Sequence, residues 1–213
     1  EHRGVPVGGD WTEVLSSDDA QFGGSGVHNA GVLVADEAPA HGFDRSLTLT
    51  LAPLSLDHWE AYATGWADPE LTTFIGGKPR ARQESWTKFT QGVGLWPLLG
   101  YGYWAFLDRQ TGSFLGNGGL ARFERGIAEL EGYPEAGWAF VPAAWGKGLA
   151  TEAMAAILAW ADTALQSEIR CIIDPGNVAS QKVAAKLGFQ HFADSEGAIG
   201  PVGVYRRHTL GAA

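Results

Sequence analysis

The sequence predicts an α/β protein with one folded domain and an N-terminal extension. Three observations favour this fold class. A glycine-rich turn at 141–152 joins an apolar strand to a long helix, and strand and helix patterns alternate from 135 to 188. The 213 residues, 45% of them hydrophobic, are enough for one good core. We expect residues 1–45 to be an acidic, Gly/Ala-rich extension and residues 46–213 to form the domain.

The turn is the most informative segment, because it has the features of a phosphate site. Gly146 and Gly148 carry no Cβ, so consecutive backbone N–H groups and the positive end of the following helix can surround a pyrophosphate. Lys147 adds a nearby cation. The alternative interpretation is an ordinary strand-to-helix turn.

Two better-known phosphate loops do not fit this turn. A Walker A loop needs a glycine five positions before the Gly-Lys pair and Ser or Thr after the lysine, where this chain has Val141 and Gly148. A dinucleotide-binding fingerprint needs a third glycine where Thr151 stands.

The segments around the turn can be taken in chain order. Residues 135–140 read as an apolar strand, and residues 149–165 place apolar side chains at helical spacing. Residues 169–173 read as a buried strand. The Asp-Pro-Gly-Asn turn at 174–177 then leads into a helix over 178–187, which Gly188 closes.

Composition excludes several classes of function. The net charge of −9, without a basic stripe interleaved with aromatics, argues against nucleic-acid binding. The six histidines show no metal-ligand spacing, so no metal is expected, and no Gly-x-Ser-x-Gly motif occurs. A single cysteine, Cys171, permits no internal disulfide and suits a reducing compartment. We expect a cytoplasmic protein without a membrane span or a signal peptide.

The N-terminal extension holds most of the acidity. Residues 1–45 carry eight acidic side chains and two arginines, a net charge of −6. Trp11, Phe22 and the apolar run at 32–34 indicate one or two short docked pieces in a loosely ordered arm. A solvated linker or a remnant of a longer chain is the simpler interpretation, and an acidic flap that attracts a cationic acceptor is the functional one.

The segment from the phosphate turn to Gly188 resembles the acetyl-coenzyme A core of the GNAT acetyltransferase superfamily. The pyrophosphate signature of that superfamily is Gln/Arg-x-x-Gly-x-Gly/Ala, and here the frame is Trp145-x-x-Gly148-x-Ala150. Tryptophan at the first position is common in the branch that resembles the ribosomal-protein alanine N-acetyltransferases (RimJ/RimL-like). Residues 145–153 fit that branch closely.

The resemblance extends from about residue 46 to residue 208. It implies a central mixed, mostly antiparallel sheet, splayed at the acetyl-coenzyme A site and flanked by helices. The matching segments are the strands at 47–54, 103–106, 114–116 and 135–140, the first helix at 57–66, the hairpin at 108–112, Asn177-x-x-Ser180 and Lys186-Leu187-Gly188-Phe189.

The resemblance implies transfer of an acetyl group from acetyl-coenzyme A to a primary amine, by direct attack in a ternary complex. Backbone groups of the strand at 138–141 would pair with the pantetheine arm, and the loop at 145–151 would take the pyrophosphate. The implied donor-binding residues are Trp138, Ala139, Phe140, Val141, Trp145, Gly146, Lys147, Gly148, Leu149, Ala150, Thr151, Asn177, Ser180 and Lys182.

Proton transfer needs a base and an acid. Glu135 is the first choice for the base, and a solvent-facing carboxylate at a strand end is the alternative. The tyrosine that many GNAT enzymes use as the acid is replaced by Ala184, so the branch suggests Ser180. Asn177 and Ser180 can equally be the N-cap and the first turn of a helix. Acidic residues on the acceptor side, which could instead bind a cationic substrate, are Asp68, Glu70 and Glu84.

Nine tryptophans are many for this length. Core packing is the safer interpretation for Trp59, Trp86, Trp104 and Trp160, which lie on apolar faces. Five other aromatic residues fall in segments that border the acceptor groove of related proteins, where their rings could hold a substrate stem or a cation: Tyr62, Trp66, Phe74, Tyr101 and Tyr103.

Two functions from different classes remain open. The first is an N-acetyltransferase acting on a protein N-terminal amine or a small-molecule amine, including an aminoglycoside. The second is a non-catalytic acyl-coenzyme A binding module, which remains an alternative because the tyrosine that usually acts as the acid is missing. In both cases we expect a monomer or homodimer without nucleic-acid or membrane partners.

Overall fold

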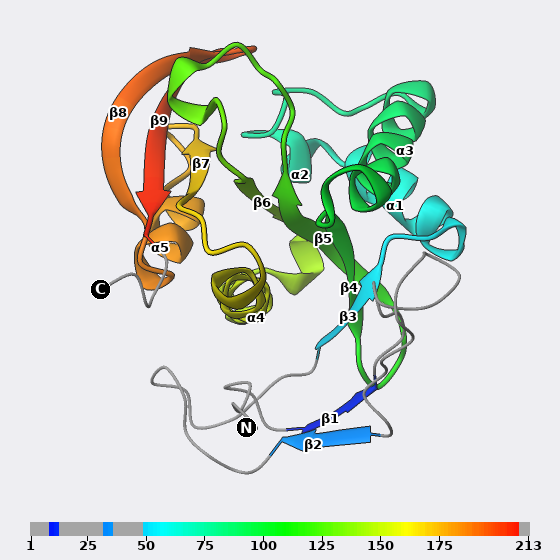
Figure 1. Cartoon of the computed structure of the whole chain (residues 1–213). Helices are drawn as coiled ribbons and strands as arrows, with labels where there is room; N and C mark the ends of the chain where they lie inside the picture. The colour runs from blue at the N-terminus through cyan, green and yellow to red at the C-terminus, as the bar shows by residue number, and fades with distance from the viewer. Residues whose placement is uncertain (1–8, 13–31, 36–48, 209–213) are drawn as a thin grey trace.

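The computed structural model describes residues 9–12, 32–35 and 49–208, and it contains a mixed, mostly antiparallel seven-stranded sheet with helices on both faces (Figure 1). The predicted fold class is therefore confirmed. Strands β1 (Gly9–Thr12) and β2 (Val32–Ala35) form a separate antiparallel pair. The side chains of residues 1–45, including Trp11, Phe22 and the run at 32–34, lie outside what the structure describes.

The sheet has the order β3-β4-β5-β6-β7-β9-β8, and only β6 and β7 run parallel. A parallel pair cannot be joined by a hairpin, so a helix connects these two strands. The strands are β3 (Leu49–Pro53), β4 (Tyr103–Asp108), β5 (Phe114–Ala121), β6 (Glu135–Phe140), β7 (Ile169–Ile173), β8 (Gln190–Gly197) and β9 (Gly200–Arg207).

Two groups of helices cover the two faces of the sheet (Figure 1). Because side chains alternate along a strand, Phe140 of β6 packs with α4 on one face, while Ala139 joins the cluster of α1 and α3 on the other. The helices are α1 (Trp59–Trp66), α2 (Pro69–Thr72), α3 (Arg82–Leu99), α4 (Leu149–Ala164) and α5 (Val178–Lys186).

The elements around the glycine-rich turn match the sequence prediction closely. Strands β6 and β7 have the expected bounds, and α4 and α5 each end one residue before the predicted ends. The face of α4 that packs on the sheet is the predicted apolar stripe, buried at Ala153, Met154, Ile157, Leu158 and Ala161. The predicted strand at 47–54 is β3, although residues 47–48 lie outside the described ranges.

Two expectations about buried tryptophans are wrong. Trp86 is 43% exposed and Trp160 is 36% exposed, so neither is a core residue. Trp160 lies at the end of a helical stripe, where its ring packs edge-on against Trp104 rather than under the sheet. Trp86 packs against Trp59 and Phe89 at the outer surface of α3.

A buried ion pair ties the C-terminal strand to the helices. Arg207 of β9 donates to both carboxylate oxygens of Asp162 in α4 at 2.7 Å, and its Nε donates to the carbonyl of Leu187 at the end of α5. One side chain thus holds α4, α5 and β9 together. Within the described ranges, no helix combines the length and the apolarity that crossing a bilayer requires.

Candidate functional site

The two parallel strands separate almost as soon as they meet. Strands β6 and β7 share a single paired position, Glu135 with Arg170. The backbone N–H of Arg170 donates to the carbonyl of Pro134 at 3.0 Å, at the very start of β6. Beyond this point the two strands diverge, which leaves a gap in the sheet toward their carboxyl ends.

The backbone of β6 turns some of its hydrogen-bonding groups toward this gap. The N–H of Val141 donates to the carbonyl of Leu115 at 2.9 Å, and the carbonyl of Ala139 also lies against β5. In an antiparallel pair, the residues between these turn their N–H and C=O groups to the opposite side. The backbone groups of Trp138 and Phe140 therefore point away from β5, toward the gap. Because the carbonyl of Phe140 accepts from the indole of Trp145, an extended ligand could pair with the N–H and carbonyl of Trp138 and with the N–H of Phe140.

The glycine-rich turn begins where β6 ends. Gly146 and Gly148 have φ of 73° and 80°, a conformation that favours glycine, and Gly148 is the N-cap of α4. The first backbone bond of α4 runs from Glu152 N–H to the carbonyl of Gly148, so the N–H groups before it are the free donors of the helix start. Such donors, together with the helix dipole, suit a phosphate group.

Trp145 fixes the start of this turn. Its indole Nε1 donates to the carbonyl of Phe140 at 2.7 Å, which ties the turn to the last residue of β6. The ring is still 49% exposed. This position, where the superfamily signature has Gln or Arg, thus carries a group that braces the loop. Lys147 beside it is exposed, whereas Thr151 is buried in the first turn of α4.

Strand β7 leads from the other side of the gap into α5. The side-chain oxygen of Asn177 accepts a hydrogen bond from the N–H of Ser180 at 3.0 Å, so Asn177 acts as the N-cap of this helix. Ser180 is partly exposed and Lys182 is exposed. Ala184 is fully buried in the core beneath α4, so no side chain there can act as an acid.

Glu135 points to the face of the sheet that carries α1 and α3. Its carboxylate, 6% exposed, accepts two hydrogen bonds from Nε of Arg125 at 3.0 and 2.8 Å. The alternative of a solvent-facing strand-end carboxylate does not hold, since the group is buried and paired. Sequence reasoning missed Arg125, because it lies in an irregular loop ten residues before Glu135, where no periodicity marks it.

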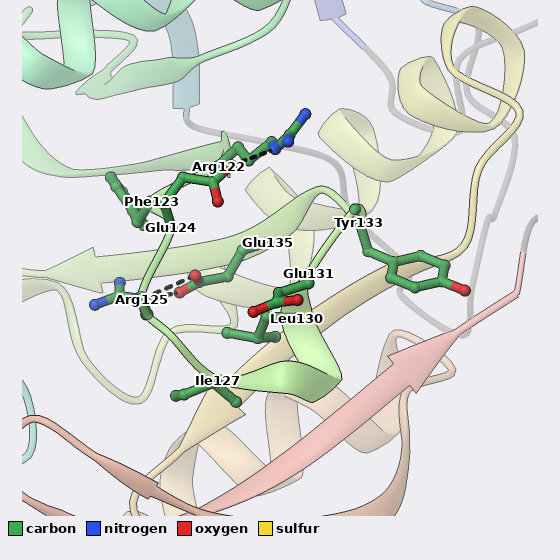
Figure 2. A pocket seen from close by; sticks show the side chains of 10 residues that line it. Arg122, Phe123, Glu124, Arg125, Ile127, Leu130, Glu131, Tyr133 and Glu135 are labelled. Carbon is green, nitrogen blue, oxygen red and sulfur yellow. Dashed lines mark hydrogen bonds and ion pairs between the residues drawn. The ribbon is translucent and has the colours of Figure 1, made fainter.

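A small recess, open to solvent, lies beside this ion pair. Figure 2 shows that the Arg125–Glu135 pair and the ring of Tyr133 lie on opposite sides of it. The loop between β5 and β6 supplies most of its lining. Glu135 is therefore reachable from solvent through this loop, although most of its surface is covered.

A tyrosine of β4 reaches the same part of β6. The hydroxyl of Tyr103 lies against Gly137, and its electrostatic neighbours include Glu135, Arg125 and Tyr62. Burial, with the nearby carboxylate of Glu135, raises the pKa of Tyr103 well above its ordinary value. Burial also raises the pKa of Tyr62 to about 12. Both phenols are therefore neutral hydrogen-bonding groups at physiological pH.

The acidic residues expected on the acceptor side have structural partners. Asp68 caps α2 by accepting from the N–H of Glu70 at 2.7 Å, and Glu84 accepts from the N–H of Ala81 at the start of α3. Glu70 itself is exposed. Among the aromatic residues, Tyr62 and Trp66 are buried between α1 and the sheet, Tyr101 packs against the core around α4, and Phe74 is 42% exposed.

The N-terminal part of the chain is similar to a different kind of protein. The family model for the alpha amylase C-terminal all-beta domain matches residues 2–61. The 1,4-alpha-glucan branching enzyme of Nocardia farcinica is 52% identical over 56 residues, which are 26% of this chain and only 8% of that enzyme. The chain thus spans a small fraction of the branching enzymes that it matches.

The rest of the chain matches acetyltransferases. The family model for the acetyltransferase (GNAT) domain covers residues 48–190. The YkkB protein of Bacillus subtilis is 32% identical over 144 residues, 66% of this chain and 80% of that protein. A GnaT-family acetyltransferase structure from Bordetella pertussis superimposes with a TM-score of 0.68 at 27% identity, over 75% of this chain and 95% of that one.

A more distant structure shows the same fold with a ligand. It is a phosphinothricin acetyltransferase from Sinorhizobium meliloti in complex with AcCoA, with a TM-score of 0.57 and 18% identity over 76% of this chain and 88% of that one. The gap between β6 and β7 and the glycine-rich turn are the features that the resemblance to this family leads one to expect, and the family model matches the same part of the chain. This chain belongs to the GNAT acetyltransferase family.

Proposed function

We propose that the protein is an N-acetyltransferase that transfers an acetyl group from acetyl-coenzyme A to a primary amine, by direct attack in a ternary complex. The observation that carries the proposal is the divergence of β6 from β7, with the backbone of Trp138 and Phe140 facing the gap. The gap leads directly to the free N–H groups at the start of α4. One continuous surface could thus hold an extended arm and a pyrophosphate.

The residues present fit such a donor. Trp138 would bind the pantetheine amides through its backbone N–H and carbonyl, and Phe140 through its N–H, since the carbonyl of Phe140 already accepts from Trp145. A backbone N–H on this strand would stabilise the developing oxyanion. Ala139 and Val141 direct their backbone groups to β5, so they would contribute side-chain packing instead. The pyrophosphate would lie on the turn 145–151, with Lys182 near its phosphates, and Asn177 would contact the donor through its amide nitrogen.

Two residues would move the protons. Glu135 would take the proton from the incoming ammonium, directly or through a water, since the amine must be neutral to attack. Arg125 holds this carboxylate at the start of β6. Ser180, partly exposed at the start of α5, would supply the proton to the departing thiolate.

Two features support a placement within the family and a division of the chain. The Trp145-Gly-x-Gly148-x-Ala150 sequence supports the branch that resembles the ribosomal-protein alanine N-acetyltransferases. The start of the family match at residue 48 supports a catalytic domain at 46–213 with the extension at 1–45. The match of residues 2–61 to the alpha amylase C-terminal domain, with the similarity of 56 residues to a branching enzyme, supports the interpretation of this extension as a remnant of a longer chain rather than an acidic flap.

A non-catalytic acyl-coenzyme A binding module is the second candidate. One observation favours it: Ala184 is fully buried at the position of the usual acid. Substitution of the proposed proton carriers separates the two functions. Glu135→Gln and Ser180→Ala should lower turnover and keep donor affinity if the protein is an enzyme.

The test is steady-state thiol release from acetyl-coenzyme A, with N-terminal peptides, amino acids, polyamines and aminoglycosides as acceptors. Acceptor-dependent release that falls in Glu135→Gln, with unchanged donor affinity by calorimetry, supports the enzyme. Lys186→Gln, an exposed change on the far end of α5, serves as the control. Tight donor binding without release on any amine would instead support the binding module.

A further inference from the structure

The residue of interest is Arg80, on the side of the sheet to which Glu135 and Tyr103 point. Arg80 lies between α2 and α3, and its backbone N–H donates to the carbonyl of Trp66 at 2.9 Å. Its guanidinium stacks on the ring of Trp66, 3.6 Å from the ring centre. The indole Nε1 of Trp66 in turn donates to Asn117 of β5 at 3.0 Å. The arginine therefore rests on a platform that is fixed to the sheet.

Among the residues that the structure describes, no carboxylate pairs with this guanidinium. Nη1 of Arg80 is buried without a hydrogen bond, and Tyr62 is the side chain within hydrogen-bonding range of the group. Burial lowers the pKa of Arg80. Glu84, an acid that interacts electrostatically with Arg80, uses its carboxylate to cap α3. Because a buried N–H of a charged group without an acceptor is costly, Nη1 of the partly buried Arg80 suits an anionic ligand.

The neighbouring charges have the same sign. Burial, Arg125 and Arg80 together lower the pKa of Lys88 on α3. The Nζ of Lys88 donates a hydrogen bond to the side-chain oxygen of Gln91 at 3.3 Å. Arg125 is neutralised by Glu135. The excess positive charge thus comes from Arg80 and Lys88, in a chain whose net charge is −9.

The face of α3 that carries Lys88 adds another unused donor. Ser85 lies three residues before Lys88, on the same side of the helix, and its hydroxyl is buried without a partner. Gly92, seven residues after Ser85, lies against the Cβ of Tyr103. This side of α3 therefore faces the sheet next to Tyr103, and Lys88 on it interacts electrostatically with Arg80.

The space is adjacent to the reacting end of the proposed donor site. The hydroxyl of Tyr103 lies against Gly137 of β6 and interacts electrostatically with Arg80 and Glu135. One phenol therefore lies against the strand at the gap and is also close enough to Arg80 to interact with it electrostatically. An acceptor amine near Glu135 would place its neighbouring groups within reach of Arg80.

We propose that Arg80, assisted by Lys88, binds a carboxylate of the acceptor, so that the preferred substrate is an amine that carries a carboxylate rather than a polyamine or an aminoglycoside. This inference rests on the proposed function. The planar guanidinium matches a carboxylate in geometry, and the desolvated setting strengthens the pair. Such a carboxylate would give Nη1 of Arg80 the acceptor that it lacks among the described residues, in a charge-assisted hydrogen bond.

The test uses acceptor pairs with the same amine: Ala-Ala against its C-terminal amide, and Ala-Asp against Ala-Asn. We expect kcat/KM to be about 10-fold to 100-fold higher for a carboxylate member in the native protein. Arg80→Gln should abolish this preference, chiefly through KM, and Arg80→Lys should keep part of it. The matched control is Arg82→Gln, which removes an exposed arginine paired with Glu60. Equal use of both members, or a preference that survives Arg80→Gln, overturns the inference.

A binding experiment separates this inference from the proposed function. N-acetylalanine and its amide are titrated into the coenzyme A-saturated protein by calorimetry, which requires no turnover. Carboxylate-selective binding that disappears in Arg80→Gln, while the near-UV circular dichroism spectrum is retained, supports the anion site even if no amine is acetylated. Equal binding of the two probes, or binding of neither, rejects it, whatever the turnover assay shows.

Discussion

The hydroxyl group of Tyr103 lies directly against the α-carbon of Gly137, two strands away. Tyr103 is paired with Gly119 of β5, and Gly119 is paired with Gly137 of β6, so the three residues form one row across the sheet. A Cβ at 137 would overlap the phenol oxygen. Two consecutive glycines in the row thus let one side chain of β4 cross β5 and reach the strand that borders the gap.

The first prediction concerns this row. Gly137→Ala should destabilise the protein by roughly 1–3 kcal/mol, because the methyl group forces the buried ring to move. Tyr103→Phe removes the overlapping atom and leaves the ring carbon 3.5 Å away, so the cost should largely disappear in the double variant. Urea denaturation of the four proteins measures this coupling. An equal cost in both backgrounds would contradict the close approach.

The second prediction compares two glycines with the same backbone conformation. Gly146 has φ of 73° and Gly100, at the end of α3, has φ of 74°, and an added Cβ would meet nothing at either position. Replacement by alanine should cost about 1–2 kcal/mol of stability at both sites, since L-residues disfavour this region. Only Gly146→Ala should weaken acetyl-coenzyme A binding, by about tenfold.

Calorimetry with acetyl-coenzyme A checks this second prediction. A comparable loss of affinity in Gly100→Ala would show that backbone strain acts through general loosening of the fold. Unchanged affinity in Gly146→Ala would place the pyrophosphate elsewhere.

The third prediction concerns the ion pair between Arg207 and Asp162. Asp162→Asn leaves the guanidinium buried without a counter-charge, and it should lower the free energy of unfolding by about 3–5 kcal/mol. Glu60→Gln breaks the exposed pair with Arg82 and should cost less than about 1 kcal/mol. Chemical denaturation compares the two variants directly. Similar costs would mean that water reaches the Arg207 pair.

The fourth prediction concerns the single cysteine. Cys171 is fully buried in β7, and burial raises the pKa of its thiol well above the ordinary value of 9.0. The native protein should therefore resist thiol reagents, which react only after denaturant is added. This inertness also means that thiol release in the acetyl-transfer assay reports coenzyme A alone.

The raised pKa of the Cys171 thiol also makes the free energy of unfolding depend on pH. Above the unfolded thiol pKa of 9.0, the unfolded chain loses a proton that the folded chain keeps, so the free energy of unfolding falls as the pH rises. Between pH 7.5 and 9.5 the contribution should be about 1 kcal/mol. Cys171→Ala should lose that part of the pH dependence in urea denaturation. An unchanged pH dependence would contradict a buried, neutral thiol.

Some elements could not be predicted from the sequence for identifiable reasons. Helix α3 contains Gly92, Gly94 and Pro97, which are poor helix formers, and its long run depends on packing against α1 and β4. Strand β8 is an edge strand with weak alternation of burial, so its pattern resembles a loop. Both elements are decided by neighbours that are distant in the chain.

The sequence by itself determined the region from β6 to α5. Apolar periodicity and the placement of Gly146, Gly148 and Gly188 determine structure within a few residues of themselves. The strands, the glycine-rich turn and both helix ends can therefore be predicted from local sequence. The loss of the usual tyrosine at Ala184 is likewise visible without a structure.

Only the tertiary structure decided which groups meet at the site. The register of β6 on β5 selects Trp138 and Phe140 to face the gap, and the row through Gly119 brings Tyr103 to Gly137. The stacking of Arg80 on Trp66 leaves a partly buried cation whose Nη1 has no acceptor among the described residues. These relationships join segments that are far apart in sequence, and they depend on strand pairing and on the burial of charge, which no local pattern encodes.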